Sequence, residues 1–110
     1  MSRKTQQRAY ADGMMYLYVR KGSANPKTID DLTPAGKLRF DYRSIRQEDY
    51  EFSEQLGRQL ALKVNAPLCD IPTAESFVRI GDVLYAIIRI DPDRRKKEMY
   101  MYLTEVRRLA

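Results

Sequence analysis

Alternation of apolar and polar residues with a period of two is the feature that most constrains the fold of this chain. It recurs in short blocks that Gly, Pro and Asp residues separate, a pattern typical of mostly β proteins. The clearest block is 37–43, where Leu38, Phe40 and Tyr42 share one face and charged side chains occupy the other. Because successive side chains of a strand point to opposite faces, this block predicts a strand with one face on a hydrophobic core.

Five further blocks have strand character, at 14–20, 59–65, 76–80, 83–90 and 99–106. Gly81 and Asp82 separate two of them and predict a tight hairpin turn. Block 83–90 is apolar on both faces, which favours the centre of a covered sheet or a strand of a closed barrel. In the last block the expected inward residues are Met99, Met101 and Leu103, opposite to Tyr100, Tyr102 and Thr104.

The segment 44–57 breaks this period and predicts a short helix or a mobile loop between the second and third strands. Ser44 is the candidate N-cap and Gly57 the candidate C-cap. The apolar stripe is thin, consisting of Ile45, Phe52 and Leu56. A helix with so little apolar surface is expected to dock loosely or to need a partner.

Six strands and one helix in 110 residues predict a single domain, a small antiparallel β-barrel. Barrel closure is favoured because it removes exposed strand edges. Residues 1–12 are polar and are expected to form a flexible N-terminal arm. The polar stretch 21–36 contains Pro26, Pro34 and Gly36, and we expect a loop there, as we do at the charged segment 91–98.

Composition excludes several catalytic chemistries. The chain has no His and one Cys, which rules out a Ser-His-Asp triad, a Cys-His pair, a His-ligated metal and an internal disulfide. Its carboxylate pairs are Asp30 with Asp31, Glu48 with Asp49, and Asp91 with Asp93. Turn chemistry and solubility explain such pairs, so we expect no enzyme, no cofactor and no metal site.

The charge balance permits contact with nucleic acid without requiring it. There are 20 Lys and Arg residues against 15 Asp and Glu residues, a net charge of +5, and the two signs are interleaved. The run 94–97 has four adjacent cations, which suit either a phosphate or acidic partner or a solvated turn. Eight tyrosines suit either base stacking or packing. The chain has no run of 18 apolar residues and a polar start, so we expect it in a reducing cytoplasm.

Two parts of the chain resemble the head-closure (stopper) and head-tail joining (adaptor) proteins of tailed bacteriophages. The run 39–57 carries an "I-x-Q/E-x-D/E-Y/F" opening at Ile45, Gln47, Asp49 and Tyr50. The second part has a hairpin turn and a Tyr-containing apolar strand at 80–91, followed by an Asp-Arg loop and the closing strand 100–106. The likeness spans about residues 14–109, and it rests on the order and spacing of motifs.

The resemblance implies a small β-barrel that forms a ring, commonly of twelve subunits, beneath the portal and adaptor rings of the virion. The implied partners are those rings, the tail terminator or tail-completion proteins, and the packaged double-stranded DNA in the channel, with no membrane. Synthesis would take place in the host cytoplasm. In this family the segment between the second and third strands closes the channel. Carried over to this chain, the gate consists of Ser44, Ile45, Arg46, Gln47, Glu48, Asp49, Tyr50, Glu51, Phe52, Ser53, Glu54, Gln55, Leu56 and Gly57.

The candidate contacts with DNA or partner proteins are basic and lie around the gate and in the charged hairpin. They are Arg43, Arg46, Arg58, Arg94, Arg95, Lys96 and Lys97. Two other functions remain open: a free-standing barrel that binds nucleic acid, and a tail-completion protein at the same joint. A free-standing barrel would be a monomer that binds oligonucleotides tightly, whereas a stopper would bind DNA weakly.

Overall fold

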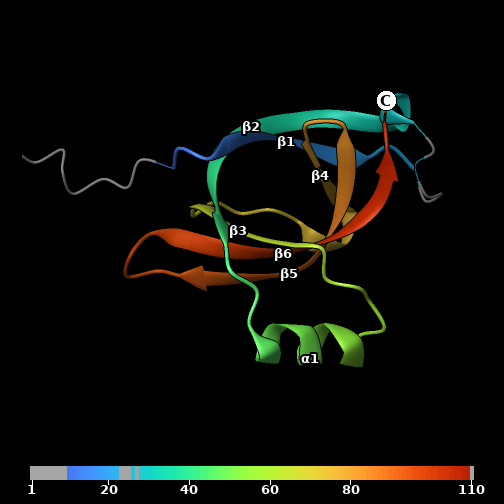
Figure 1. The fold of residues 1–110 in the computed structure, drawn as a ribbon. Helices are drawn as coiled ribbons and strands as arrows, with labels where there is room; N and C mark the ends of the chain where they lie inside the picture. The colour runs from blue at the N-terminus through green and yellow to red at the C-terminus, as the bar shows by residue number, and fades with distance from the viewer. Residues whose placement is uncertain (1–9, 23–25, 27, 110) are drawn as a thin grey trace, which may run out of the picture.

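The computed structural model describes residues 10–22, 26 and 28–109, and their fold is a closed antiparallel β-barrel of six strands (Figure 1). The strands are β1 (Gly13–Arg20), β2 (Leu32–Arg43), β3 (Leu62–Pro67), β4 (Ser76–Ile80), β5 (Val83–Asp93) and β6 (Glu98–Arg108). Around the barrel they follow the order β1, β2, β3, β6, β5, β4. The predicted fold is therefore confirmed.

Among the residues that the structure describes, three helical elements interrupt the strands. They are the 3-10 turns η2 (Ile29–Asp31) and η3 (Thr73–Glu75) and the helix α1 (Gln47–Gln55), which connects β2 to β3. The hairpin between β4 and β5 turns at the predicted position, and Gly81 there has a φ of 60°, a conformation that glycine adopts at no steric cost.

The core fills the inside of the barrel, and the alternation predicted for the last strand is confirmed. Met99, Met101 and Leu103 of β6 are fully buried and pack against inward residues of the other strands. Phe40 is also fully buried, and its ring lies so close to Gly13 that a Cβ added there would be 2.9 Å from a ring carbon. Tyr102 points outward yet is also buried. The outward surface around Tyr102 must therefore be covered by another element.

The strand β2 begins earlier than the sequence predicts, because pairing with β1 overrides the loop signals. It starts at Leu32 and includes Pro34, which pairs with Tyr18 beside an irregularity in the register. A proline is tolerated there because β3 pairs only with 41–43, which leaves the first part of β2 without a neighbour on that side. Tyr42 was expected to point into the core, but it is 49% exposed. β1 begins at Gly13, opposite Phe40, and does not extend alongside Tyr42, which therefore lies at the open end of the barrel.

The charged loop expected at 91–98 is shorter in the structure. β5 continues to Asp93 and β6 begins at Glu98, so that only the four cations form the turn. Glu98 is 1% exposed, and its carboxylate accepts hydrogen bonds from Asn65 Nδ2 at 3.0 Å and from Tyr100 Oη at 3.1 Å. A buried carboxylate requires such hydrogen-bond donors. Because Glu98 has them, it can belong to β6, and the strands of the hairpin are longer than the polar sequence predicts.

Of the predicted N-terminal arm, residues 1–9 lie outside the described residues. The remaining three are bound to the barrel: Asp12 N donates to Phe40 O at 3.1 Å, and Tyr42 N donates to the Asp12 carboxylate at 2.9 Å. Tyr10 Oη donates to Glu98 at 3.2 Å. Contacts with the barrel therefore begin before β1.

Candidate functional site

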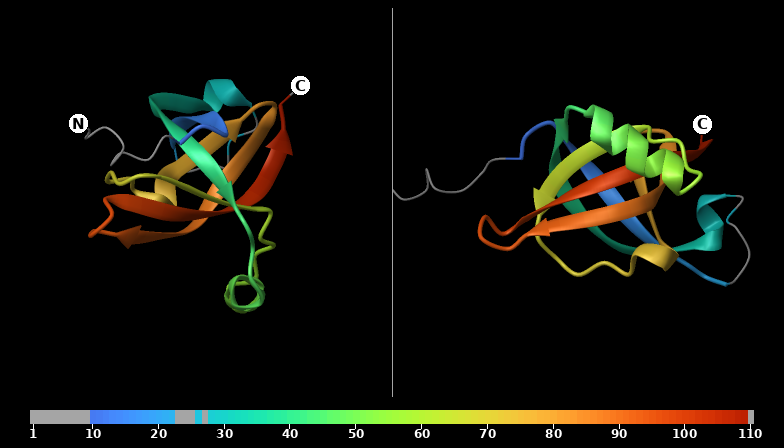
Figure 2. Two further views of the ribbon diagram at one scale, coloured as in Figure 1. Left: turned by 60° about the vertical axis from the view of Figure 1, so that its left-hand side comes forward. Right: turned by 90° about the horizontal axis from the view of Figure 1, so that it is seen from below.

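The segment that the resemblance assigns as the gate lies outside the barrel. Figure 1 shows α1 below the strands, joined to β2 and β3 by two irregular connections, and the right-hand view of Figure 2 shows it lying across the barrel wall. The predicted helix is therefore present, and it forms an excursion from the barrel. The C-cap of α1 is Leu56, and the predicted glycine, Gly57, follows it one residue later with a φ of 70°, the left-handed conformation that commonly ends a helix.

The N-terminal end of α1 differs from the prediction. The N-cap residue is Arg46, and Ser44 lies two residues outside the helix. Asp49 makes the capping contact: its Oδ2 accepts a hydrogen bond from Arg46 N at 2.9 Å, while Arg46 O accepts one from Asp49 N at 3.0 Å. An acid three residues after the N-cap satisfies a terminal backbone donor, so Asp49 replaces the expected serine.

The face of α1 that meets the barrel combines buried polar side chains with Phe52, a member of the expected apolar stripe. The buried residues of the helix are Asp49 and Ser53. Leu56, a member of the expected stripe, is 56% exposed, and Tyr50 is 46% exposed. The helix turns these polar side chains inward because the outer surface of the barrel beneath it is itself polar and aromatic.

Three adjacent outward side chains form this docking surface on β3, β6 and β5. Lys63 pairs with Tyr102 across the sheet, and Tyr102 pairs with Arg89. Lys63 Nζ lies 2.9 Å from Asp49 Oδ2, and both side chains are about nine-tenths buried, with 9% and 10% exposed. This ion pair is the polar half of the attachment of α1.

Aromatic packing forms the other half. The ring of Phe52 meets the ring of Tyr102 edge to face, with centroids 5.2 Å apart and planes at 89°. The guanidinium of Arg89 lies 4.8 Å from the centroid of the same Phe52 ring. Edge-to-face pairs and cation–π contacts are each worth about 0.5–1.5 kcal/mol, so the attachment is specific but not strong.

The electrostatics of the attachment shift two ionisation equilibria. Burial alone would raise the pKa of Asp49, but the hydrogen bonds from Arg46 N and Lys63 and the charge of Lys63 outweigh it and hold that pKa below its usual value. Burial, the charges of Asp49 and Asp91 and a hydrogen bond to Asp91 raise the pKa of Tyr102 to about 12. Asp49 is thus held as a carboxylate and Tyr102 as a neutral phenol.

A pocket of about 520 Å³ opens where β2 leaves the barrel towards α1. Its lining residues are Tyr42, Arg43, Ser44, Arg46, Lys63, Tyr100 and Tyr102. All the charged side chains among them are positive, and Arg43 and Lys63 lie 5.8 and 5.7 Å from the ring centroid of Tyr100. Cations beside phenolic hydroxyls suit a phosphate group, so we call this space the cationic pocket.

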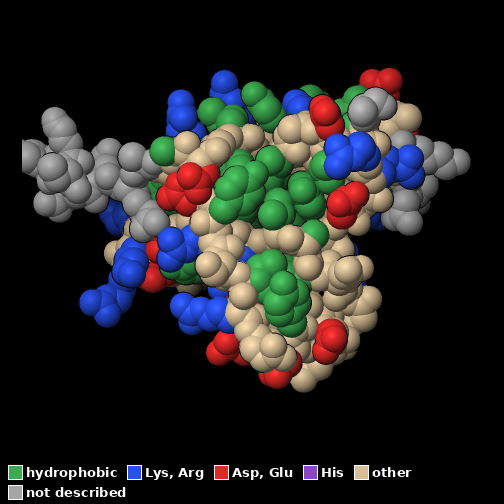
Figure 3. Space-filling view, viewed as in Figure 1, with side chains coloured by type: hydrophobic (Ala, Val, Ile, Leu, Met, Phe, Trp, Pro, Cys, Tyr) green, Lys and Arg blue, Asp and Glu red, His purple; other side chains and the backbone are tan. Residues whose placement is uncertain are grey.

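The structure brings together only two of the predicted basic contacts, Arg43 and Arg46, in the cationic pocket. Arg58 is exposed after α1. The four cations at 94–97 are exposed at the tip of the β5–β6 hairpin and do not line that pocket. Figure 3 shows basic side chains at the end of this hairpin and acidic side chains over α1, so the two charge clusters are separate.

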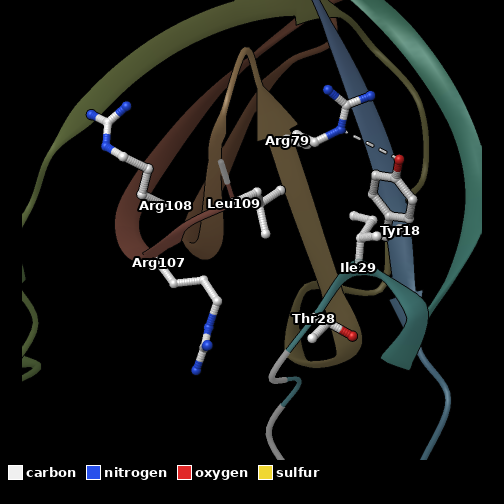
Figure 4. A pocket seen from close by; sticks show the side chains of 7 residues that line it. All are labelled: Tyr18, Thr28, Ile29, Arg79, Arg107, Arg108 and Leu109. Carbon is white, nitrogen blue, oxygen red and sulfur yellow. Dashed lines mark hydrogen bonds between the residues drawn. The ribbon is translucent and has the colours of Figure 1, made fainter.

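A second pocket was not anticipated from the sequence. It has a volume of about 490 Å³, and Arg79, Arg107 and Arg108 contribute to its lining (Figure 4). Arg107 and Arg108 are adjacent in the sequence and could have been noted as a basic pair. Nothing in the spacing relates them to Arg79, because only the folded barrel brings β4 and the end of β6 to one place.

No protein-family model matches this chain, and no curated protein matches it significantly. Within 10–22, 26 and 28–109, no cluster of three or more acidic, Cys or His residues could hold a metal ion. The function of the chain must therefore be inferred from its own residues and their geometry.

Proposed function

We propose that this protein is a structural component of a tailed-bacteriophage virion that forms a ring at the head-tail joint and closes the DNA channel after packaging. The main support for this proposal is the placement of α1. The helix is inserted between β2 and β3, where the phage head-closure proteins that this sequence resembles have their gate. It docks on the outside of the barrel. It is held there by the Asp49–Lys63 pair and the ring contacts of Phe52.

Such an attachment allows the gate to move without unfolding the barrel. The pairing of 41–43 with 63–65 between β2 and β3 involves no residue of α1, so release of the helix would leave these strand hydrogen bonds in place. Segments with few buried apolar contacts open locally at low cost in free energy. Ordering and release of such a segment is a common switching mechanism.

The charges of α1 suit a gate that must not bind DNA permanently. Glu48, Glu51 and Glu54 are all exposed on the helix. A polyanion is repelled by these side chains, and a channel lined with mixed or negative charge lets DNA slide out, whereas a wholly basic lining would hold its phosphates. The gate would therefore obstruct DNA sterically.

In this proposal the barrel assembles on the portal and adaptor rings, commonly as twelve copies, and presents its other face to the tail terminator or tail-completion proteins. Exposed apolar side chains of the barrel wall, Tyr16 and Val106, and the cations at 94–97 are the expected subunit and partner contacts. Contacts of this kind would add stability to a domain with a small core.

The cationic pocket favours one alternative, a free-standing barrel that binds nucleic acid. A backbone phosphate would lie beside Arg43 and Arg46, and a base would stack on Tyr42, which is 49% exposed at the open end of the barrel. This function would require tight binding of oligonucleotides by the monomer, with a strong dependence on salt concentration.

The mass of the purified protein, measured by light scattering, separates the two functions. We expect a ring only after the protein is mixed with the portal and adaptor complex of its phage, together with weak, salt-sensitive binding to a short DNA duplex. A monomer that ignores that complex and binds the duplex tightly would contradict the head-closure proposal and support the alternative.

Deletion of residues 47–56 tests the gate itself. We expect the shortened chain to assemble on the adaptor with unchanged mass, because the barrel remains intact, while filled heads lose their DNA. An R39S variant, altered at an exposed position of β2 outside α1, should retain the DNA. Retention of DNA by assembled particles that lack 47–56 would show that α1 is not the gate.

A further inference from the structure

The second pocket lies at the end of the barrel opposite to α1. Figure 1 shows the C-terminal end of β6 and η2 on the side of the molecule away from the helix. The lining residues are Tyr18, Thr28, Ile29, Arg79, Arg107, Arg108 and Leu109, and the volume is about 490 Å³. Pockets of roughly 300–1,000 Å³ are typical of ligand sites, and a single inorganic anion would fill only part of this one.

The floor of this pocket is apolar and continuous with the protein interior. Ile29, Leu109 and Tyr18 pack against the buried cluster of Leu32, Phe77 and Leu84. Leu109 is also fixed through its backbone, since its N donates to Asp82 O at 2.6 Å. A ligand that covers this floor must therefore carry an apolar group.

The charge around this floor is of one sign. The charged lining side chains are all arginines, Arg79 from β4 and Arg107 and Arg108 from the end of β6. Figure 4 shows Leu109 between Arg107 on one side and Arg79, Tyr18 and Ile29 on the other, with the side chains of Arg107 and Arg108 extending away from Arg79. An anionic group beside an apolar one would match this arrangement.

Arg79 is already held in place for such a ligand. Its Nη1 donates to Gly81 O at 3.0 Å, its Nε makes a long hydrogen bond of 3.5 Å to Tyr18 Oη, and its guanidinium lies 4.6 Å from the ring centroid of Tyr16. These contacts leave other N–H donors of the guanidinium for a ligand and reduce the side-chain entropy lost on binding. Arg107 is exposed and makes no ion pair with any described carboxylate.

We propose that this pocket binds an acidic peptide segment of a partner protein, with an apolar side chain on Ile29 and Leu109 and separate carboxylates at Arg79 and at Arg107. Nucleic acid fits less well, because its phosphates would leave the aliphatic floor uncovered. Stacking of a base is also disfavoured, since Tyr18 is partly buried and its hydroxyl is engaged by Arg79. This site would exist whether or not the chain closes a DNA channel.

Fluorescence anisotropy of the full chain with a fluorescein-labelled peptide of sequence DELFED tests the proposal. We expect saturable binding that weakens with salt, and a loss of affinity of about fivefold or more in R107E, where an attraction becomes a repulsion. The matched control is R39E, which makes the same charge change at an exposed position of β2 outside the pocket and should alter the affinity less than about twofold. Circular dichroism spectra should show both variants folded.

Four results would overturn the proposal. The first is the absence of saturable binding, and the second is an equal loss of affinity in R107E and R39E, which would mean unspecific attraction to a basic protein. The third is equal affinity for the wholly acidic peptide DEEDED, because the apolar floor would then be unused. The fourth is displacement of the peptide by a twelve-residue oligothymidylate at lower concentration than by unlabelled peptide, which would assign the pocket to nucleic acid.

Discussion

The ion pair between Asp49 and Lys63 allows a quantitative test of how α1 is attached. Replacement of either residue by alanine would remove more than the charge, because Asp49 also accepts a hydrogen bond from Arg46 N. D49N keeps an oxygen for that hydrogen bond, and K63M keeps most of the lysine stem against the tyrosine rings. A double-mutant cycle of these two variants therefore isolates the interaction between the charges.

The expected coupling free energy follows from the distance and the burial. At 2.9 Å and an effective dielectric constant of about 20, the Coulomb attraction is about 6 kcal/mol. Both side chains are about nine-tenths buried, and their desolvation offsets most of that attraction. We expect a net coupling of about 2 kcal/mol, between the values for exposed pairs and for fully buried ones.

Hydrogen exchange reports this coupling locally. A loss of about 2 kcal/mol raises the population of the detached helix about thirtyfold, and the amides of α1 should exchange faster by that factor. The amides of β6 should keep their rates, because its hydrogen bonds lie within the barrel. The measurement is exchange followed by mass spectrometry of peptides that cover α1 and β6 separately, in the wild type and the three variants of the cycle.

Two results would refute this reasoning. A coupling below about 0.5 kcal/mol would mean that the pair is no stronger than an ordinary surface ion pair. Equal acceleration of exchange in α1 and β6 would mean that the pair stabilises the whole domain, in which case α1 would not be a separately detachable segment.

Three further predictions concern the same attachment and the core. The pKa of Asp49 is lowered in the folded protein, so the stability that its carboxylate contributes is complete above its ordinary pKa of about 4. This contribution is lost as the pH falls through the folded pKa. Protection of the α1 amides from hydrogen exchange should therefore decrease below about pH 4 in the wild type but not in D49N. F52A should admit water to the phenol of Tyr102 and lower its pKa from about 12, as measured by NMR titration of the ring carbons; an unchanged value would show that α1 does not cover this ring. G13A should lower the free energy of unfolding, measured in urea, by about 1–3 kcal/mol, because the added Cβ would lie 2.9 Å from a buried aromatic ring. The control G22A has no atom within 4 Å of its added Cβ and should change this free energy by less than about 0.5 kcal/mol.

The strands and turns could be predicted because their signals are local. Alternation determines which residues of β6 face inward, and it correctly separates Met101 from Tyr102. The turn at Gly81 and the end of α1 at Gly57 depend on backbone conformations that glycine favours. Each of these features is determined within a few residues, so the sequence alone contains the information.

The errors concern features that depend on distant residues. Pro34 lies in a strand because β1 pairs with that part of β2 and β3 does not. The burial of Asp49 could not be expected from a helical wheel, since it depends on Lys63 of β3. A hydrophobic stripe predicts the buried face of a helix only where the surface beneath the helix is apolar. Here that surface consists of polar and aromatic side chains that point outward from the barrel.

Local sequence signals predict a six-stranded β domain with a helical insertion between the second and third strands. Which basic residues lie together depends on the folded barrel. Arg43 and Arg46 join Lys63 in the cationic pocket, while Arg79 and Arg107 line the pocket at the other end. The physical reason is that periodicity places a side chain on a face of its own strand, whereas closure of the barrel and its register determine which side chains of other strands lie beside it.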